Sequence, residues 1–154
     1  LVKDARRLKE SVCEKDPYEH QGLRRVLNFG HTFGHVLEGV SNFKLSHGDA
    51  VGLGMLFALD AGRALGVTPE AVATRVEAAL ERGPGVLPRK KAAALFKRAA
   101  LSDIEALLAA DKKTGAAGEL RMVLLTALGV AEVRDVSAAQ WRALWPAWTQ
   151  GVRP

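Results

Sequence analysis

The segment SHGDAVGLGMLFALDAGRAL, residues 46–65, constrains the fold more than any other part of the chain. Ser46, followed three residues later by Asp49, is a capping-box-like helix start. The apolar residues that follow occupy almost every face of the helix, so other elements must cover it on all sides. This helix is therefore predicted to lie buried at the centre of the fold.

The preceding segment, residues 23–40, is predicted to be a helix with one polar stripe. At about 100° per residue, one narrow face collects Arg24, Asn28, His31, His35 and Glu38. A solvated face would hold Lys and Glu, whereas these groups chelate metals, donate hydrogen bonds or move protons. Gly30 and Gly34 share another flank, where a second backbone or a ligand can approach closely.

The rest of the chain is predicted to add further helices and a hairpin. Thr68 is expected to cap a helix with Pro69 in its first turn, and Ser137 to cap a helix whose three tryptophans pack into the core. The expected helices span residues 2–14, 68–83, 89–100, 102–110 and 137–151, and the expected strands span 119–125 and 131–134. The predicted fold is a mainly α, multi-helical domain with one small β-hairpin near the carboxy terminus.

Composition limits the classes of function. The 154 residues are 48% hydrophobic and 25% charged, which fits one globular domain over 1–154. A net charge of +5 and a pI near 9.7 favour an anionic partner. The basic residues are scattered among acidic ones and aromatic content is only 6%, so the stacking platform of nucleic-acid binders is missing. A small phosphorylated or carboxylated metabolite is favoured.

The cysteine content indicates the compartment, and the start of the chain indicates whether the chain is part of a longer protein. The single cysteine, Cys13, cannot form an internal disulfide, which favours the reducing cytoplasm. No apolar run of about 18 residues is present, so neither a membrane span nor a membrane partner is predicted. The chain starts without methionine inside a helical pattern, which suggests a piece of a longer protein.

The histidines form a plausible metal site from the residues alone. Neutral imidazoles bind Zn²⁺, and a catalytic zinc takes three protein ligands and an open position. His31 and His35, four residues apart on a helix, can share an ion that His47 would complete. Glu38 and Asp49 are the acidic residues nearby.

These residues resemble the 3-dehydroquinate synthase family of the shikimate pathway. The resemblance covers residues 1–135 and rests on three stretches: GLRRVLNFGHTFGHVLE, SHGDAVGLGM and DKKTGAAGELRMVLLTALG. It implies the carboxy-terminal helical domain of a two-domain enzyme, with the amino-terminal Rossmann-like NAD domain absent from this chain. The implied reaction converts 3-deoxy-D-arabino-heptulosonate 7-phosphate to 3-dehydroquinate and phosphate. NAD and zinc, or another divalent metal such as cobalt, are the implied cofactors, and a homodimer is the implied state of the complete enzyme.

The resemblance also implies a role for each site residue. His31 and His47 match the metal-binding histidines, whereas His35 matches an active-site histidine that does not ligate the metal. The third metal ligand is then a glutamate of the amino-terminal half. The remaining catalytic or substrate-binding positions are Lys9, Glu19, Arg24, Asn28 and one of Lys112 and Lys113.

Three other functions remain as alternatives. A related sugar phosphate cyclase shares the metal histidines but acts on another sugar phosphate. An iron-type alcohol dehydrogenase carries a comparable His-x-x-x-His helix. A non-enzymatic helical module would bind an anionic partner or nucleic acid through net charge, and its binding would weaken steeply with salt.

Overall fold

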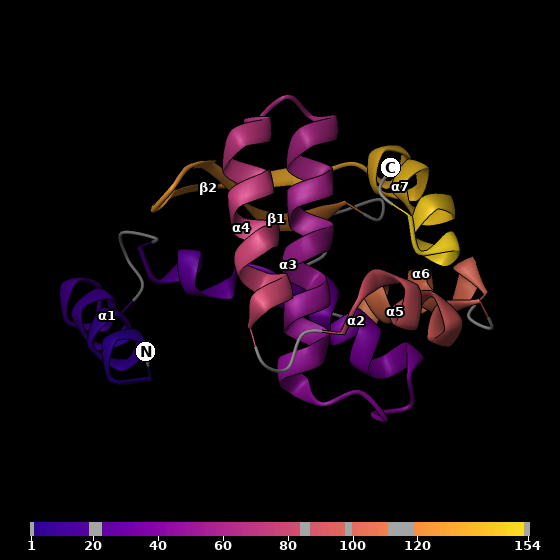
Figure 1. The fold of residues 1–154 in the computed structure, drawn as a ribbon, viewed down its shortest axis with the longest axis horizontal. Coiled ribbons are helices and arrows are strands. Elements are labelled where there is room, and N and C mark those ends of the chain that lie inside the picture. Colours follow the sequence, from indigo (N-terminus) through magenta and orange to yellow (C-terminus); the bar gives the residue numbers. More distant parts are fainter. Residues whose placement is uncertain (1, 19–22, 84–86, 98–99, 111–118, 153–154) are drawn as a thin grey trace.

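The computed structural model describes residues 2–18, 23–83, 87–97, 100–110 and 119–152. It confirms a mainly helical fold with one hairpin (Figure 1). The elements are α1 (Val2–Lys15), the 3-10 helix η1 (Leu23–Asn28), α2 (His31–Val40), α3 (His47–Ala64), α4 (Glu70–Arg82), α5 (Arg89–Phe96), α6 (Leu101–Ala110), β1 (Leu120–Ala127), β2 (Val130–Val136) and α7 (Ala138–Gln150).

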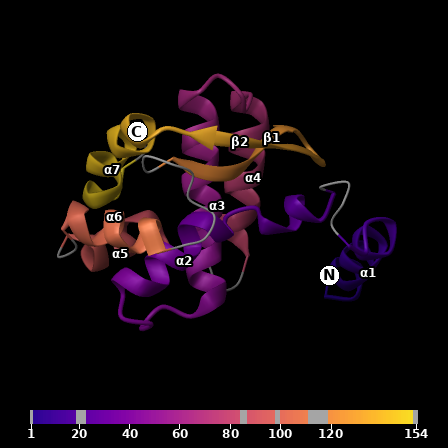
Figure 2. The same cartoon turned by 180° about the vertical axis from the view of Figure 1, so that it is seen from behind.

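Helix α3 lies at the centre, as its sequence predicts. Leu53, Phe57 and Leu59 have no exposed surface, and the Phe57 ring stacks on that of Phe33 from α2 at 3.6 Å between centroids. Helix α4 runs beside α3, the hairpin crosses behind both, and α5–α7 gather at one end (Figures 1 and 2). Helix α1 stands at the opposite end of the molecule, where it contacts η1.

The predicted single helix over residues 23–40 is wrong. Residues 23–28 form η1, and α2 begins at His31 after Gly30, whose φ is +80°. The break has a packing cause: a β-carbon on Gly54 of α3 would overlap the Gly30 carbonyl oxygen and lie 2.8 Å from the Gly34 nitrogen. Close backbone approach at the two glycines is thus confirmed, and the left-handed conformation that permits it ends the first segment.

The predicted cap of α4 is also wrong. Pro69 occupies the cap position, and no side-chain hydrogen bond caps the helix. The Thr68 side chain instead packs against Gly62 of α3, where a β-carbon on the glycine would overlap the threonine hydroxyl. Among the described residues, the Thr68 hydroxyl is the buried side-chain group without a hydrogen-bond partner. Packing against α3 has replaced the capping bond.

The carboxy-terminal prediction is confirmed. Strands β1 and β2 pair antiparallel, with Leu120 opposite Val136 and a bulge between Leu125 and Ala127. Ser137 and Gln140 form a complete capping box at the start of α7. The α7 residues Trp141, Trp145 and Trp148 are at most 7% exposed.

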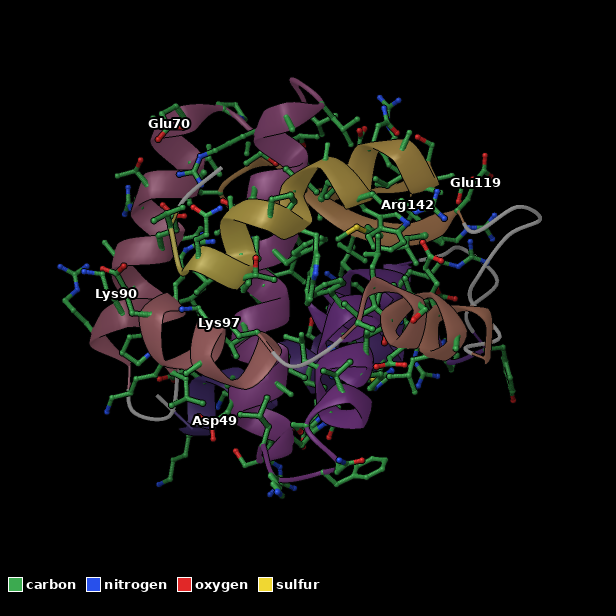
Figure 3. All side chains as sticks on the ribbon, turned by 90° about the vertical axis from the view of Figure 1, so that its right-hand side faces the viewer. Asp49, Glu70, Lys90, Lys97, Glu119 and Arg142 are labelled. Carbon is green, nitrogen blue, oxygen red and sulfur yellow. The ribbon has the colours of Figure 1, made fainter. Side chains whose placement is uncertain are left out.

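Helix α7 crosses the face above α5 and α6 (Figure 3). An ion pair of 2.7 Å between Arg142 and Glu105 links α7 to α6. Helix α5 ends at Phe96, four residues before its predicted end. No helix among the described ranges is both long enough and apolar enough to cross a membrane.

Candidate metal and substrate site

Three histidines converge where α2 and α3 meet. His31 is the first residue of α2, His35 lies one turn further, and His47 is the first residue of α3. The ring centroids of His31 and His47 are 5.4 Å apart, those of His31 and His35 5.9 Å, and those of His35 and His47 6.1 Å. The glycine contacts that bring α2 against α3 therefore also bring the imidazoles together.

The loop between α2 and α3 turns the chain back so that His47 reaches α2. Asn42 and Phe43 adopt positive φ angles of 51° and 57°. Ser46 then caps α3, because its hydroxyl oxygen accepts a hydrogen bond of 3.2 Å from the Asp49 backbone nitrogen. The predicted role of Ser46 is confirmed, and the Asp49 carboxylate in turn accepts a hydrogen bond of 2.6 Å from the Ser46 hydroxyl.

The donor set fits a divalent transition metal. Zinc–nitrogen bonds are about 2.0–2.1 Å, so two imidazoles on one tetrahedral ion have ring centroids about 5 Å apart. The His31–His47 separation of 5.4 Å is nearest to this value. Both pairs that include His35 are wider. By ring spacing alone, His31 with His47 is therefore the pair nearest to a shared ion, and it is also the pair implied by the family resemblance.

A second grouping includes an acidic residue. Among the described residues, the ligand atoms of His35, Glu38 and His47 lie within 4.8 Å of one another. Ligands of one tetrahedral ion are closer, about 3.3 Å apart. Within this group, Nδ1 of His47 and Oε1 of Glu38 are already 3.1 Å apart, a hydrogen-bond distance. This group leaves out His31, and within it Glu38 is a hydrogen-bond partner of His47.

The substrate-side residues are only partly assembled. The Arg24 guanidinium donates a hydrogen bond of 3.0 Å to the Pro17 carbonyl, so it holds the end of α1. Asn28 is half-buried at the end of η1, and Lys9 is exposed on α1, the helix that stands apart. Glu19, Lys112 and Lys113 lie outside the described residues. The structure thus brings together the three histidines, and the roles of all these residues stay predictions.

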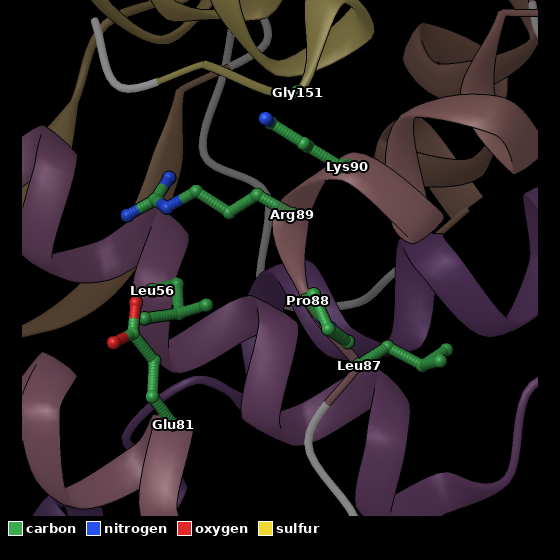
Figure 4. A pocket seen from close by; sticks show the side chains of 7 residues that line it. All are labelled: Leu56, Glu81, Leu87, Pro88, Arg89, Lys90 and Gly151. Carbon is green, nitrogen blue, oxygen red and sulfur yellow. The ribbon is translucent and has the colours of Figure 1, made fainter.

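A cavity of about 430 Å³ opens elsewhere, between α3, α4, α5 and the end of α7 (Figure 4). Its lining comprises Leu56, Glu81, Leu87, Pro88, Arg89, Lys90 and Gly151, none of them a predicted site residue. The Arg89 guanidinium is already engaged, since it donates to Asp60 and Glu77 and lies 4.7 Å from the Trp148 ring centre. None of the three histidines lines this cavity.

Arg89 belongs to a buried ion-pair network that the sequence analysis missed. Asp60 of α3 and Glu77 of α4 are 2% and 4% exposed, and Arg63 and Arg89 pair with both. The indole Nε1 of Trp148 donates to Asp60 at 2.9 Å. Asp60 and Arg63, three residues apart in the apolar part of α3, are the signal that could have predicted this network.

Comparison with known proteins decides the family. Residues 1–114 match the family described as 3-dehydroquinate synthase C-terminal. The chain belongs to this family. The 3-dehydroquinate synthase of Bradyrhizobium diazoefficiens is 39% identical over 141 residues, which cover 88% of the chain. The 2-epi-valiolone synthase of Actinosynnema mirum is 40% identical over 147 residues, or 93% of the chain.

The chain covers only part of the length of these relatives. The chain spans 36% of the Bradyrhizobium enzyme and 37% of the Actinosynnema enzyme. A solved 2-deoxy-scyllo-inosose synthase, complexed with carbaglucose-6-phosphate, NAD⁺ and Co²⁺, shares the fold with a TM-score of 0.66 at 22% identity. That alignment covers 94% of this chain and 38% of the synthase.

Proposed function

We propose that this chain is the metal- and substrate-binding half of a 3-dehydroquinate synthase. The proposed reaction converts 3-deoxy-D-arabino-heptulosonate 7-phosphate to 3-dehydroquinate and phosphate, with NAD and a divalent metal as cofactors. The observation that carries the proposal is the convergence of His31 and His47, at 5.4 Å between ring centroids, in a chain of this family. The net charge of +5 supports an anionic substrate.

His31 and His47 are the residues proposed to hold the metal, zinc or cobalt. A glutamate from an amino-terminal half would be the third ligand, since a catalytic site of this kind uses three protein ligands. The bound ion would polarise the hydroxyl group that NAD oxidises. His35, which is exposed beside the pair, is proposed to hold or move a proton on the substrate.

The cationic residues are proposed to hold the two anionic ends of the substrate. Lys9, Arg24 and one of Lys112 and Lys113 supply ammonium and guanidinium groups for a carboxylate and a phosphate. Arg24 now donates to the Pro17 carbonyl, and an anionic oxygen would be the stronger acceptor for the same guanidinium. Glu19 and Asn28 are proposed as further polar contacts.

An NAD-binding amino-terminal half is proposed as the partner of this chain. The Bradyrhizobium and Actinosynnema enzymes are each nearly three times as long as the segment that aligns with this chain. The helical elements described here offer no strand–glycine-rich turn–helix unit for a dinucleotide pyrophosphate. A homodimer of the complete enzyme, a cytoplasmic location and the lack of a nucleic-acid partner also remain proposals.

A related sugar phosphate cyclase is the second candidate. The identity to 2-epi-valiolone synthase, 40%, equals that to the 3-dehydroquinate synthase of Nostoc and supports this alternative. The family match supports either cyclase over an iron-type alcohol dehydrogenase. The test is phosphate release by the complete enzyme with NAD⁺, metal and a panel of sugar phosphates. Release from the heptulosonate phosphate supports the proposal, whereas release only from another sugar phosphate overturns it.

A further inference from the structure

We propose that Glu38 is a positioning residue for His47. Its carboxylate accepts a hydrogen bond from Nδ1 of His47, which would leave Nε2 as the nitrogen available to hold a metal. The Nδ1–Oε1 distance is 3.1 Å. This inference rests on the proposed function only for the identity of the ligand, because the hydrogen bond itself is a property of the chain.

The chemistry of the pair fixes which ring nitrogen carries the proton. A neutral imidazole has one N–H donor and one acceptor nitrogen, and an ionised carboxylate can only accept. The pairing therefore requires the proton of His47 on Nδ1 and the lone pair on Nε2. Metal-ligating histidines in general donate their other N–H in this way, and loss of the acceptor typically costs about 10–100-fold in metal affinity.

The burial of Glu38 helps its carboxylate to hold the His47 ring in one orientation. The Glu38 side chain is 16% exposed, whereas that of His47 is 59% exposed. Water competes little for a carboxylate that is mostly covered, so its hydrogen bond can hold the ring orientation. The exposed part of His47 stays accessible to a ligand.

The backbone of Glu38 also anchors the loop that carries His47. Its carbonyl oxygen accepts hydrogen bonds from the Phe43 nitrogen at 2.8 Å and from the Ser41 hydroxyl at 2.9 Å. The Ser41 hydroxyl in turn accepts from the Leu45 nitrogen at 3.2 Å. Glu38 thus fixes both the loop and the ring, through its main chain and its side chain respectively.

The competing role for Glu38 is that of a direct metal ligand, because its oxygen belongs to the group within 4.8 Å. Glutamine separates the two roles. Its amide oxygen can still accept from Nδ1, so Glu38→Gln should preserve part of a positioning effect. A neutral amide is a much weaker ligand for these metals than a carboxylate, so the same change should abolish a ligand effect as fully as Glu38→Ala.

The experiment compares Glu38→Ala, Glu38→Gln and the control Glu105→Gln in the 154-residue chain. Glu105 is a helical glutamate whose 2.7 Å ion pair with Arg142 also joins two elements. Two quantities are measured. The first is the His47 tautomer in the metal-free chain, by long-range ¹⁵N–¹H NMR with the imidazoles neutral. The second is Co²⁺ affinity, by direct titration of the metal-free chain with Co²⁺.

The wild type and Glu105→Gln are expected to show the Nδ1–H tautomer of His47 and equal Co²⁺ affinity. Glu38→Ala should lose that tautomer preference and about 10–100-fold in affinity, with a smaller loss in Glu38→Gln. An unchanged tautomer in Glu38→Ala would overturn the proposal, as would equal affinity losses in the two Glu38 variants. A further variant, His47→Ala, tests whether His47 binds the metal at all. Unchanged Co²⁺ binding in His47→Ala would contradict the proposed metal site. The His47 tautomer in the metal-free chain would still report on the role of Glu38.

Discussion

Gly54 of α3 lies directly against Gly30 at the start of α2, so closely that a β-carbon on Gly54 would overlap the Gly30 carbonyl oxygen. This contact sets how near α2 comes to α3. Since His31 follows Gly30 and His47 begins α3, the same contact sets the spacing of the two histidines.

Gly54→Ala should therefore destabilise the domain and disturb the site. The new methyl group meets backbone, which cannot rotate away, and such overpacking typically costs about 1–3 kcal/mol or more. Urea unfolding measures the stability. Gly48→Ala in the same helix is the control, because nothing lies within 4 Å of its added β-carbon. Equal stability of the two variants would show that α2 and α3 are not held by this contact.

The buried ion-pair network should be sensitive to loss of one partner. Asp60→Ala removes the acceptor of Trp148 and two arginines, and loss of one partner from a buried pair costs about 3–5 kcal/mol. Thermal unfolding checks this. Arg121→Ala is the control, because its pair with Asp135 is exposed and should contribute little. An Asp60→Ala melting curve that overlays the control would contradict a structural role for the network.

Alkaline pH should not weaken the Arg63 part of this network. The hydrogen bond to Glu77 is the main cause that raises the pKa of Arg63 above its ordinary value. A raised folded-state pKa gives stabilisation that is complete below the unfolded-state pKa and is lost only above it. That range lies in strong alkali. The stability difference between wild type and Arg63→Ala should stay constant from neutral to mildly alkaline pH, and a steady decline over this range would contradict it.

The sequence predicts those elements whose signals are local. Three signals of this kind are confirmed: the apolar circumference of α3, the Ser137 capping box and the two short strands around Gly129. The sequence does not predict the break at Gly30, because helical periodicity continues across it and only the contact with α3 requires a left-handed glycine there.

The site was predictable to a different extent. The histidine pattern and its resemblance to a family indicate the metal residues, but the Glu38–His47 hydrogen bond depends on the loop between α2 and α3. That loop places Asn42 and Phe43, neither of them glycine, at positive φ, a conformation that such residues adopt rarely. The ion-pair network likewise joins residues from α3, α4, α5 and α7, which no local pattern links.

The chain alone is expected to be a folded domain without catalysis. The core formed by α2 and α3 needs no other chain to bury Phe33 and Phe57. His31 and His47 supply only two ligands, so metal should be held weakly. Folding is tested by circular dichroism, and metal binding by metal retention after dialysis. Catalysis is tested by phosphate release with NAD⁺ and substrate. Turnover by the isolated chain would contradict the proposed division of the site, and an unfolded chain would show that the other half belongs to its core.

The central claim is that His31 and His47 bind the metal and His35 does not. It is tested most directly by measuring metal content and turnover in three histidine variants of the complete enzyme. His31→Ala and His47→Ala should each lose the metal and all activity, because one imidazole fewer leaves too few ligands for a catalytic site. His35→Ala should keep the metal and turn over more slowly. A metal-free His35→Ala enzyme beside a metal-loaded His31→Ala or His47→Ala enzyme would contradict the assignment of the His31–His47 pair.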